Sequence, residues 1–195
     1  TTSDNSSFSN TTVCPNYDRS EYSHWIDADG DCQDTRIEVL IAENLGTITY
    51  STSNSCKIIT GSWYDPFSNS TLTTASRLDV DHMVPLKEAH ESGGYLWTST
   101  KKKEYANALS SPETLIAFSG SINRSKGSRD PAEWLPPNTN YHETYAQNWA
   151  NIKIKWGLTA DAQEITALKS ILGPSATLPT QAEDIPNPYA AVPAL

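Results

Sequence analysis

The stretch Leu78-Asp79-Val80-Asp81-His82-Met83-Val84-Pro85-Leu86 decides the architecture that this sequence predicts. Its first half alternates, so Leu78, Val80 and His82 share one face of a strand and the two aspartates share the other. Pro85 has no N–H group to donate, and it therefore predicts that the strand ends there and the chain turns. An aspartate and a histidine thus stand together where a strand opens into a loop. This arrangement suits a metal ion beside a general base.

A second segment, Ser121-Ile122-Asn123-Arg124-Ser125-Lys126-Gly127, follows an apolar run at residues 115–118 that predicts a partner strand. Gly127 predicts the end of a short helix in this segment. The order Asp-His-x-x-Pro, strand, Asn-x-x-Lys-Gly resembles the His-Me finger (HNH) endonuclease family, and more narrowly its secreted microbial DNase branch. The likeness runs from about residue 17 to about residue 172. Further stretches follow the order of that branch: Trp25, residues 32–36, 105–109 and 131–136.

The resemblance implies an α+β fold with a ββα-metal core, additional N-terminal strands and C-terminal helices. Alternation predicts a hairpin between residues 36–41 and 47–50, with further strands at 57–63 and 71–74. Helical spacing of Tyr145, Trp149 and Trp156 predicts a helix over 142–156, and Asp161 caps a second one that reaches residue 172. Shorter helices are expected at residues 87–91 and from Thr98 to residue 109.

The length of 195 residues suits one domain with a sizeable core, which we expect over residues 17–173. Residues 1–16 show no periodicity and are predicted to form a flexible arm. The proline-rich residues 174–195 are predicted to form a tail. No apolar run is long enough to cross a bilayer, so we expect no membrane association, and no segment indicates an obligate protein partner.

The resemblance implies roles for five side chains. His82 would be the general base, because an imidazole titrates near neutral pH. Asp81 and Asn123 would hold one divalent ion, most simply Mg²⁺, with Mn²⁺ or Zn²⁺ as alternatives, and Asn123 thereby joins the catalytic set. Lys126 would lie near the substrate phosphate, and Arg124 joins it because the two residues frame Asn123. The alternative for His82 is a strand-end histidine satisfied by a backbone carbonyl.

Three positions leave the interpretation open. Arg36 is a candidate for catalysis and for a further phosphate contact, because a guanidinium can bind two oxygens at once. An ion pair with Asp79 or Asp34 is an equal alternative for Arg36. The middle asparagine of the family falls on Thr114 here, so another polar group is expected to orient His82. His90 is expected to lie on the surface or in a wall rather than to bind metal.

The net charge of −9 is unusual for an enzyme that binds phosphate backbones. The distribution of charge is uneven: residues 1–50 carry nine acidic and two basic side chains, whereas residues 101–129 carry six basic and two acidic ones. A basic strip therefore lies in the same segment as Asn123. Lys101, Lys102 and Lys103 alone fit a solvated helix face better than a binding patch.

Several features indicate a secreted protein. Glycosylation sequons occur at Asn5, Asn10 and Asn69. A fourth lies at Asn123, where metal binding requires that the sequon is skipped. Three cysteines cannot all pair within one chain, and the secreted DNase branch typically has a pair at Cys32 and Cys56. That pair would staple the predicted hairpin and leave Cys14 over.

Asp27, Asp29 and Asp31 alternate like the start of a calcium loop. The distal glutamate of a full loop is taken as absent, so an acidic turn is favoured over bound Ca²⁺. The predicted function is a metal-dependent endonuclease that acts on DNA through backbone contacts, with RNA as the second substrate. By family chemistry it would leave 5′-phosphate and 3′-hydroxyl ends. The alternatives are a secreted glycoside-active enzyme and a non-catalytic calcium-binding module.

Overall fold

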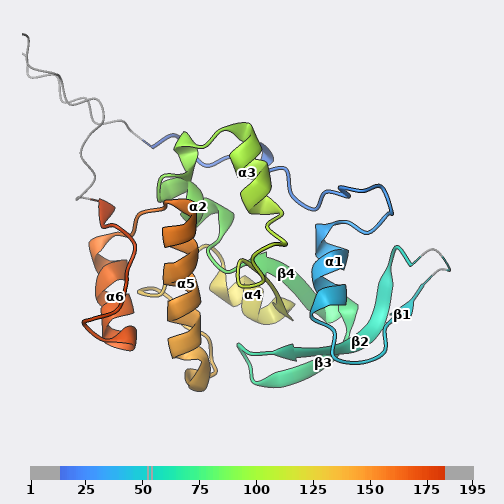
Figure 1. Cartoon of the computed structure of the whole chain (residues 1–195). Helices are drawn as coiled ribbons and strands as arrows, with labels where there is room; N and C mark the ends of the chain where they lie inside the picture. Colours follow the sequence, from blue (N-terminus) through green and yellow to red (C-terminus); the bar gives the residue numbers. More distant parts are fainter. Residues whose placement is uncertain (1–13, 52, 54, 183–195) are drawn as a thin grey trace, which may run out of the picture.

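The computed structural model describes residues 14–51, 53 and 55–182, and it is α+β, as the sequence predicts (Figure 1). A three-stranded antiparallel sheet has the order β1-β2-β3, and a separate antiparallel pair is formed by β4 and β5. The strands are β1 (Thr49–Tyr50), β2 (Ile58–Asp65), β3 (Ser70–Thr74), β4 (Leu78–His82) and β5 (Leu115–Ser119). The helices are α1 (Thr35–Ala42), α2 (Leu86–Glu91), α3 (Ser99–Ala106), α4 (Gly120–Lys126), α5 (His142–Trp156) and α6 (Ala162–Leu172). Short 3₁₀ turns are η1 (Arg19–Glu21), η2 (Ala75–Arg77), η3 (Gly94–Leu96) and η4 (Thr139–Tyr141).

The unit formed by β4, β5 and α4 carries the central stretch. The register pairs Leu78 with Ser119 and His82 with Leu115, and α4 starts directly after β5 and contacts both strands. Leu78, Val80 and His82 are buried, while the two aspartates between them are partly exposed, so the predicted alternation is confirmed. Regular pairing stops at His82, and Pro85 then precedes the first residue of α2. Gly127 ends α4, as predicted, with φ +60°.

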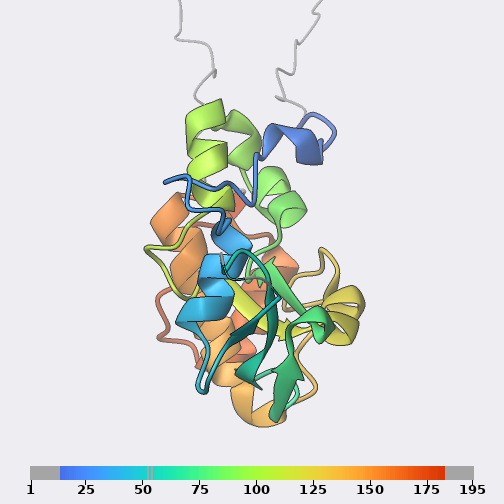
Figure 2. The same cartoon turned by 90° about the vertical axis from the view of Figure 1, so that its right-hand side faces the viewer.

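The expected strand at residues 36–41 is wrong, because this segment is helix α1 (Figure 2). Asp34 caps the helix by accepting a hydrogen bond from the backbone N–H of Ile37 at 3.0 Å. Ile37 and Leu40, three residues apart, are buried in one core cluster with Ile58 and Trp63 of β2. Isoleucine and valine favour strands locally, but the cap and this burial decide for a helix.

The second core joins α5 and α6 to the site-bearing unit. Tyr145 and Trp149 of α5 are fully buried together with Leu168 of α6, so both predicted C-terminal helices are confirmed at nearly their predicted bounds. Lys153 of α5 is fully buried and donates to Glu88 of α2 and to Glu164 of α6. No helix in the described ranges combines the length and apolarity needed to span a bilayer.

A disulfide joins Cys32 to Cys56, with 5.3 Å between the Cα atoms, as expected. It ties the loop before α1 to the loop after β1 instead of stapling a hairpin, since α1 replaces the first expected strand. Cys14 is a free thiol. Asn69 is exposed in the turn between β2 and β3, where its side-chain oxygen accepts from the Tyr64 hydroxyl, whereas Asn5 and Asn10 lie outside the described residues. The start of the predicted tail is held by a bridge between Ala160 and Gln181.

Candidate active site

A cavity of about 330 Å³ opens where β4 ends, and it brings together Asp81, His82 and Asn123. Asp81 and His82 come from β4, and Asn123 comes from the middle of α4. Asp81 and His82 are adjacent in sequence, and the distant Asn123 shares this cavity with them because α4 packs across β4 and β5. The remaining wall comes from η1 and its neighbours, from α2 and from the turn after α4, and includes Tyr17, Arg19, Pro85, Leu86, Lys87, Gly127 and Ser128.

His82 is held in one orientation and one tautomer. Its Nε2 atom lies 3.0 Å from the carbonyl oxygen of Ala106, and a carbonyl can only accept, so Nε2 carries the hydrogen. In the neutral ring the lone pair is therefore on Nδ1, which has no hydrogen-bond partner among the described residues. The rings of Trp25 and Tyr105 both stack nearly parallel to the imidazole, with ring centroids 5.8 and 5.6 Å away. The ring is thus prepared to accept a proton at Nδ1.

Burial sets the charge of this histidine. His82 is 2% exposed, and this burial lowers its pKa to about 4, against the opposing effects of Asp81 and of the Ala106 carbonyl. The positive charges of Lys126 and Arg19 lower the pKa further. His82 is therefore neutral near pH 7, which is the protonation state that a general base requires.

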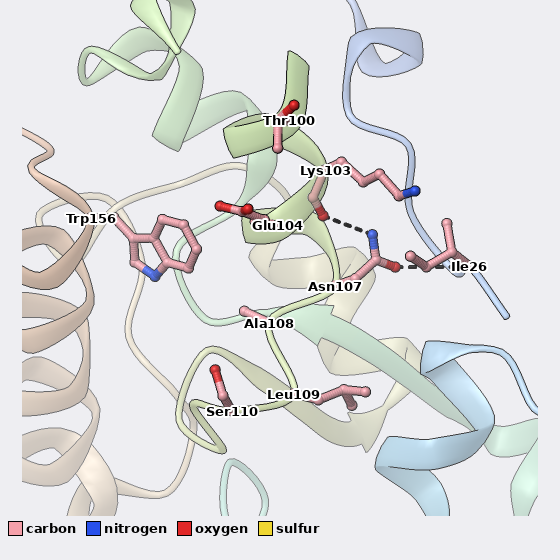
Figure 3. Close-up of a pocket in the computed structure, with 9 residues that line it drawn as sticks. All are labelled: Ile26, Thr100, Lys103, Glu104, Asn107, Ala108, Leu109, Ser110 and Trp156. Atoms are coloured by element: carbon pink, nitrogen blue, oxygen red, sulfur yellow. Dashed lines mark hydrogen bonds between the residues drawn. The ribbon is translucent and has the colours of Figure 1, made fainter. Parts of the chain in front are cut away.

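Asn107 supplies the polar bracing that Thr114 does not. Its side-chain amide donates to the carbonyls of Ser23 and Lys103, and its oxygen accepts from the backbone N–H of Ile26 (Figure 3). The Thr35 hydroxyl donates to the same oxygen. These bonds fix the end of α3, and with it the neighbouring Ala106 carbonyl that holds His82. The sequence offered one signal for Asn107, its place within residues 105–109.

A cavity of about 630 Å³, larger than the one at the candidate site, lies at Asn107 (Figure 3). Its lining combines apolar side chains with Lys103 and Glu104, and none of its residues is one of the predicted site residues. At Thr114 the backbone takes the structural role: its carbonyl accepts from the N–H of Met83 and extends the pairing of β4 with β5. The Thr114 hydroxyl is buried and has no hydrogen-bond partner among the residues that the structure describes.

Asp81 is paired with a buried lysine. Lys126 of α4 is 0% exposed, and its ammonium donates to Asp81 Oδ2 at 2.7 Å and to the His82 carbonyl at 2.9 Å. The Asp81 side chain keeps 22% of its surface exposed, and its Oδ1 atom stays available. Lys126 therefore lies against β4 rather than in the open cavity. Its hydrogen bonds to Asp81 and His82 hold α4 against β4.

Asn123 is oriented by a second aspartate of β4. Its amide Nδ2 donates to Asp79 Oδ2 at 3.1 Å, which leaves its carbonyl oxygen for another partner. Gly120 makes room for this contact, because a Cβ atom there would lie 3.1 Å from Asp79 Oδ2 and 3.3 Å from Oδ1. The sequence showed Asp79 on the same strand face as Asp81 but did not reveal this role.

Arg36 does not join the group. Its guanidinium donates to the carbonyls of Ala75 and Leu78, at the opposite end of β4 from His82. It forms no ion pair with Asp79 or Asp34 in the described part of the chain. The arginine that does line the cavity is Arg19, which sequence reasoning missed because the segment around it has no periodicity.

Lys101, Lys102 and His90 have structural partners, whereas Arg124 has none within the described residues. Lys102 is ion-paired with Glu21, and Lys101 donates to the carbonyl of Trp156, so these two lysines of α3 are already engaged. Arg124 is exposed on α4 and faces a different hollow. His90 is buried and bonds to the Pro15 carbonyl and the Tyr22 hydroxyl, which makes it a wall residue, as expected.

The acidic loop before α1 forms a compact turn. Oxygen atoms of Asp27, Asp29 and Asp31 all lie within 4.8 Å of one another, and each aspartate also accepts from backbone N–H groups of the loop. Counted from Asp27 as the first residue, Glu38 is the twelfth, so the expectation of a missing distal glutamate is wrong. Oε2 of Glu38 is buried without a partner within the described residues. Burial and the neighbouring aspartates raise the pKa of Glu38.

Comparison with known proteins identifies the family of this chain. Residues 34–171 match the family described as GmrSD restriction endonucleases, C-terminal domain. An uncharacterized secreted protein of Arthroderma benhamiae is 37% identical over 156 residues, which cover 80% of this chain and 74% of that protein. No solved structure matches. The expected relationship to HNH-type nucleases is thereby confirmed.

Proposed function

This chain belongs to the family of GmrSD restriction endonuclease C-terminal domains, and on that premise we propose that it is a secreted, metal-dependent endonuclease that hydrolyses DNA without sequence preference. The observation that carries the proposal is the shared cavity of Asp81, His82 and Asn123. These are a carboxylate, a neutral imidazole and an amide oxygen, which is the set that metal-assisted phosphodiester hydrolysis requires.

The free oxygens fit a hard divalent ion. Asp81 Oδ1 and Asn123 Oδ1 accept no hydrogen bond from the described part of the chain, and oxygen ligands favour Mg²⁺, with Mn²⁺ or Zn²⁺ as alternatives. When bound, such an ion supplies Lewis-acid stabilisation to the phosphate and to the departing oxygen. Asp79 acts as a positioning residue, because its bond to Nδ2 turns the carbonyl of Asn123 away from itself.

The hydrolysis itself uses water and His82. Nδ1 of His82 takes one proton from a water molecule, and the resulting hydroxide oxygen forms a bond to phosphorus. The bond from phosphorus to the 3′-oxygen breaks, and that oxygen takes a proton from solvent. The products are a 3′-hydroxyl and a 5′-phosphate. Arg19 and Lys87 line the same cavity and offer positive charge to the non-bridging oxygens.

Sequence preference is expected to be low. Contacts to phosphates position a nuclease without reading bases, and the proposed contacts are of this kind. Double-stranded DNA is the proposed substrate and RNA the alternative. The disulfide between Cys32 and Cys56 and the relative that is described as secreted support an extracellular location.

The variant His82→Ala tests the proposal. We expect it to lower the rate of plasmid cleavage by at least about 100-fold, the general-base range, with near-UV circular dichroism unchanged. His142→Ala serves as the matched control, because His142 bonds only to the Pro136 carbonyl outside the site. Cleavage that persists in His82→Ala, or that survives exhaustive EDTA treatment, would refute the proposed function.

A further inference from the structure

We propose that a hollow of about 280 Å³ next to the candidate active site is a subsite for a second phosphate of the bound nucleic-acid strand. The inference rests on the proposed function and names how the substrate is held. The hollow lies where η2, β4 and the start of α4 meet, and its lining includes Arg77, Arg124, Asp79 and three serines at positions 76, 119 and 121.

The lining has the donors that a phosphate needs. Arg77 and Arg124 are both exposed, and neither forms an ion pair or a side-chain hydrogen bond within the described residues. Their guanidinium groups can grip phosphate oxygens bidentately, and serine hydroxyls can donate beside them. Asp79 is the one acidic residue of the lining, and one of its oxygens is already bound to Asn123. Two positive charges thus face one negative charge, which leaves the lining with a net positive charge.

The position of the hollow fits a strand that crosses the site. Asp79 borders the hollow and Asp81 borders the catalytic cavity, two residues along the same strand. At roughly 3.3 Å per residue the two carboxylates are about 7 Å apart along β4. Successive phosphates of one DNA strand advance about 3.4 Å along the duplex axis but lie farther apart in space because the strand winds around that axis, so the hollow lies about one phosphate step from the scissile one. The Asn123–Asp79 hydrogen bond links the two hollows.

The subsite explains how a chain with a net charge of −9 can hold DNA. Binding needs local positive charge and not a positive total, and Arg77 and Arg124 supply that charge beside the reacting phosphate. Because both arginines would contact one backbone phosphate, they would add affinity without adding sequence preference.

The experiment measures binding separately from cleavage. In the full chain carrying His82→Ala, with Mg²⁺ present, the affinity for a fluorescent DNA duplex is measured by anisotropy over a range of salt concentrations. We expect the added pair R77A and R124A to weaken binding several-fold and to reduce the slope of log affinity against log salt by about 0.9, one phosphate contact. Each single variant should give most of the loss of affinity, because both arginines would contact the same phosphate. The control Lys169→Ala removes one exposed charge on α6 and should change neither quantity.

A second measurement uses the chain with His82 intact. There R77A and R124A should raise the DNA concentration needed for half-maximal cleavage several-fold and leave the rate at saturating DNA within about twofold, because binding alone is lost. An unchanged salt slope, or a large loss of rate at saturation, would overturn the subsite. Failure of the proposed function looks different, since the unsubstituted chain would then cleave no DNA with Mg²⁺, Mn²⁺ or Zn²⁺.

Discussion

Two regions of this molecule bring carboxylates together, and the regions differ in the groups that bind those carboxylates. On β4, Asp81 is paired with the buried ammonium of Lys126, and Asp79 accepts from the amide of Asn123. Side chains of α4 therefore donate hydrogen bonds to both carboxylates. In the loop before α1, oxygen atoms of Asp27, Asp29 and Asp31 lie close to one another. Within the described residues these carboxylates have no cationic partner and accept hydrogen bonds from backbone N–H groups.

The difference separates a site that is organised in advance from one that is not. Lys126 and Asn123 fix the aspartates of β4 before any ligand arrives, which is the preorganisation that a catalytic centre needs. The acidic loop keeps its negative charges close together, and Glu38 adds another from α1. Repulsion in the loop is therefore a cost to the native state, whereas pairing on β4 stabilises it.

The largest effect is expected from removal of the buried charge on α4. Lys126→Met keeps the apolar stem and leaves Asp81 without its partner. Breaking a buried ion pair typically costs 3–5 kcal/mol, and we expect about 3 kcal/mol because Asp81 retains contact with water. The measurement is urea unfolding in EDTA, and added Mg²⁺ should restore part of the loss by replacing the positive charge.

Lys87→Met is the matched control for stability, since the Lys87–Glu91 pair is half exposed and its atoms are 3.7 Å apart. It should change the free energy of unfolding by no more than about 0.5 kcal/mol. A loss below about 1 kcal/mol in Lys126→Met would show that the pair on β4 is as weak as a surface pair, and the contrast between the two regions would disappear.

The next effect concerns the orientation of Asn123. Asp79→Ala removes the acceptor for Nδ2, and Gly120→Ala pushes a methyl group against the same carboxylate. Loss of such an outer contact typically weakens metal binding by about 10- to 100-fold, so the metal concentration for half-maximal DNA cleavage should rise by that factor. Asp79→Asn still offers an oxygen to Nδ2 and should recover most of the metal affinity.

A purely structural role for Asp79 would lower cleavage equally at every metal concentration. That outcome in Asp79→Ala, with no shift of the metal titration, would contradict the orienting role. The comparison with Asp79→Asn separates geometry from charge, since this variant keeps the hydrogen bond and removes the negative charge.

The sequence predicted the parts of the site that follow from local pattern. Alternation placed Asp81 and His82 on opposite faces of β4, and Gly127 marked the end of α4, so the carriers of the chemistry were found. Contacts between distant segments could not be read in the same way. Arg19 enters the cavity from η1, and Ala106 holds His82 through its backbone, which no side-chain pattern encodes.

The helix α1 shows a second limit. Its isoleucines and valine have high strand propensity, and the prediction of a strand followed this propensity without considering Asp34 as a helix cap. Burial against β2 decides for the helix, and that packing is a tertiary fact. Because this segment is a helix and not a strand, Arg36 lies away from the site, and its side chain donates to backbone carbonyls near the start of β4.

The smallest expected effect is a change in stability when the charge of Glu38, next to the acidic loop, is removed. Glu38→Gln should raise stability in EDTA at pH 8, because burial and the nearby aspartates raise the pKa of Glu38 in the folded state. A raised folded pKa means that the stability contributed by Glu38 is present at low pH and lost as the pH rises through that pKa. The gain from glutamine should therefore shrink as the pH is lowered, and urea unfolding at several pH values measures it.

Glu43→Gln is the matched variant at a carboxylate outside the loop. Burial raises the pKa of Glu43 to about 7, and Oε2 accepts from the N–H of Ala117, a bond that glutamine can keep. Its gain at pH 8 should be on the order of 1 kcal/mol after allowance for partial exposure. Ca²⁺ distinguishes the two positions: an ion in the loop would stabilise the unsubstituted chain and Glu43→Gln but much less Glu38→Gln. Equal responses of all three to Ca²⁺ would leave the loop as an acidic turn, held together by its own backbone against the repulsion of its charges.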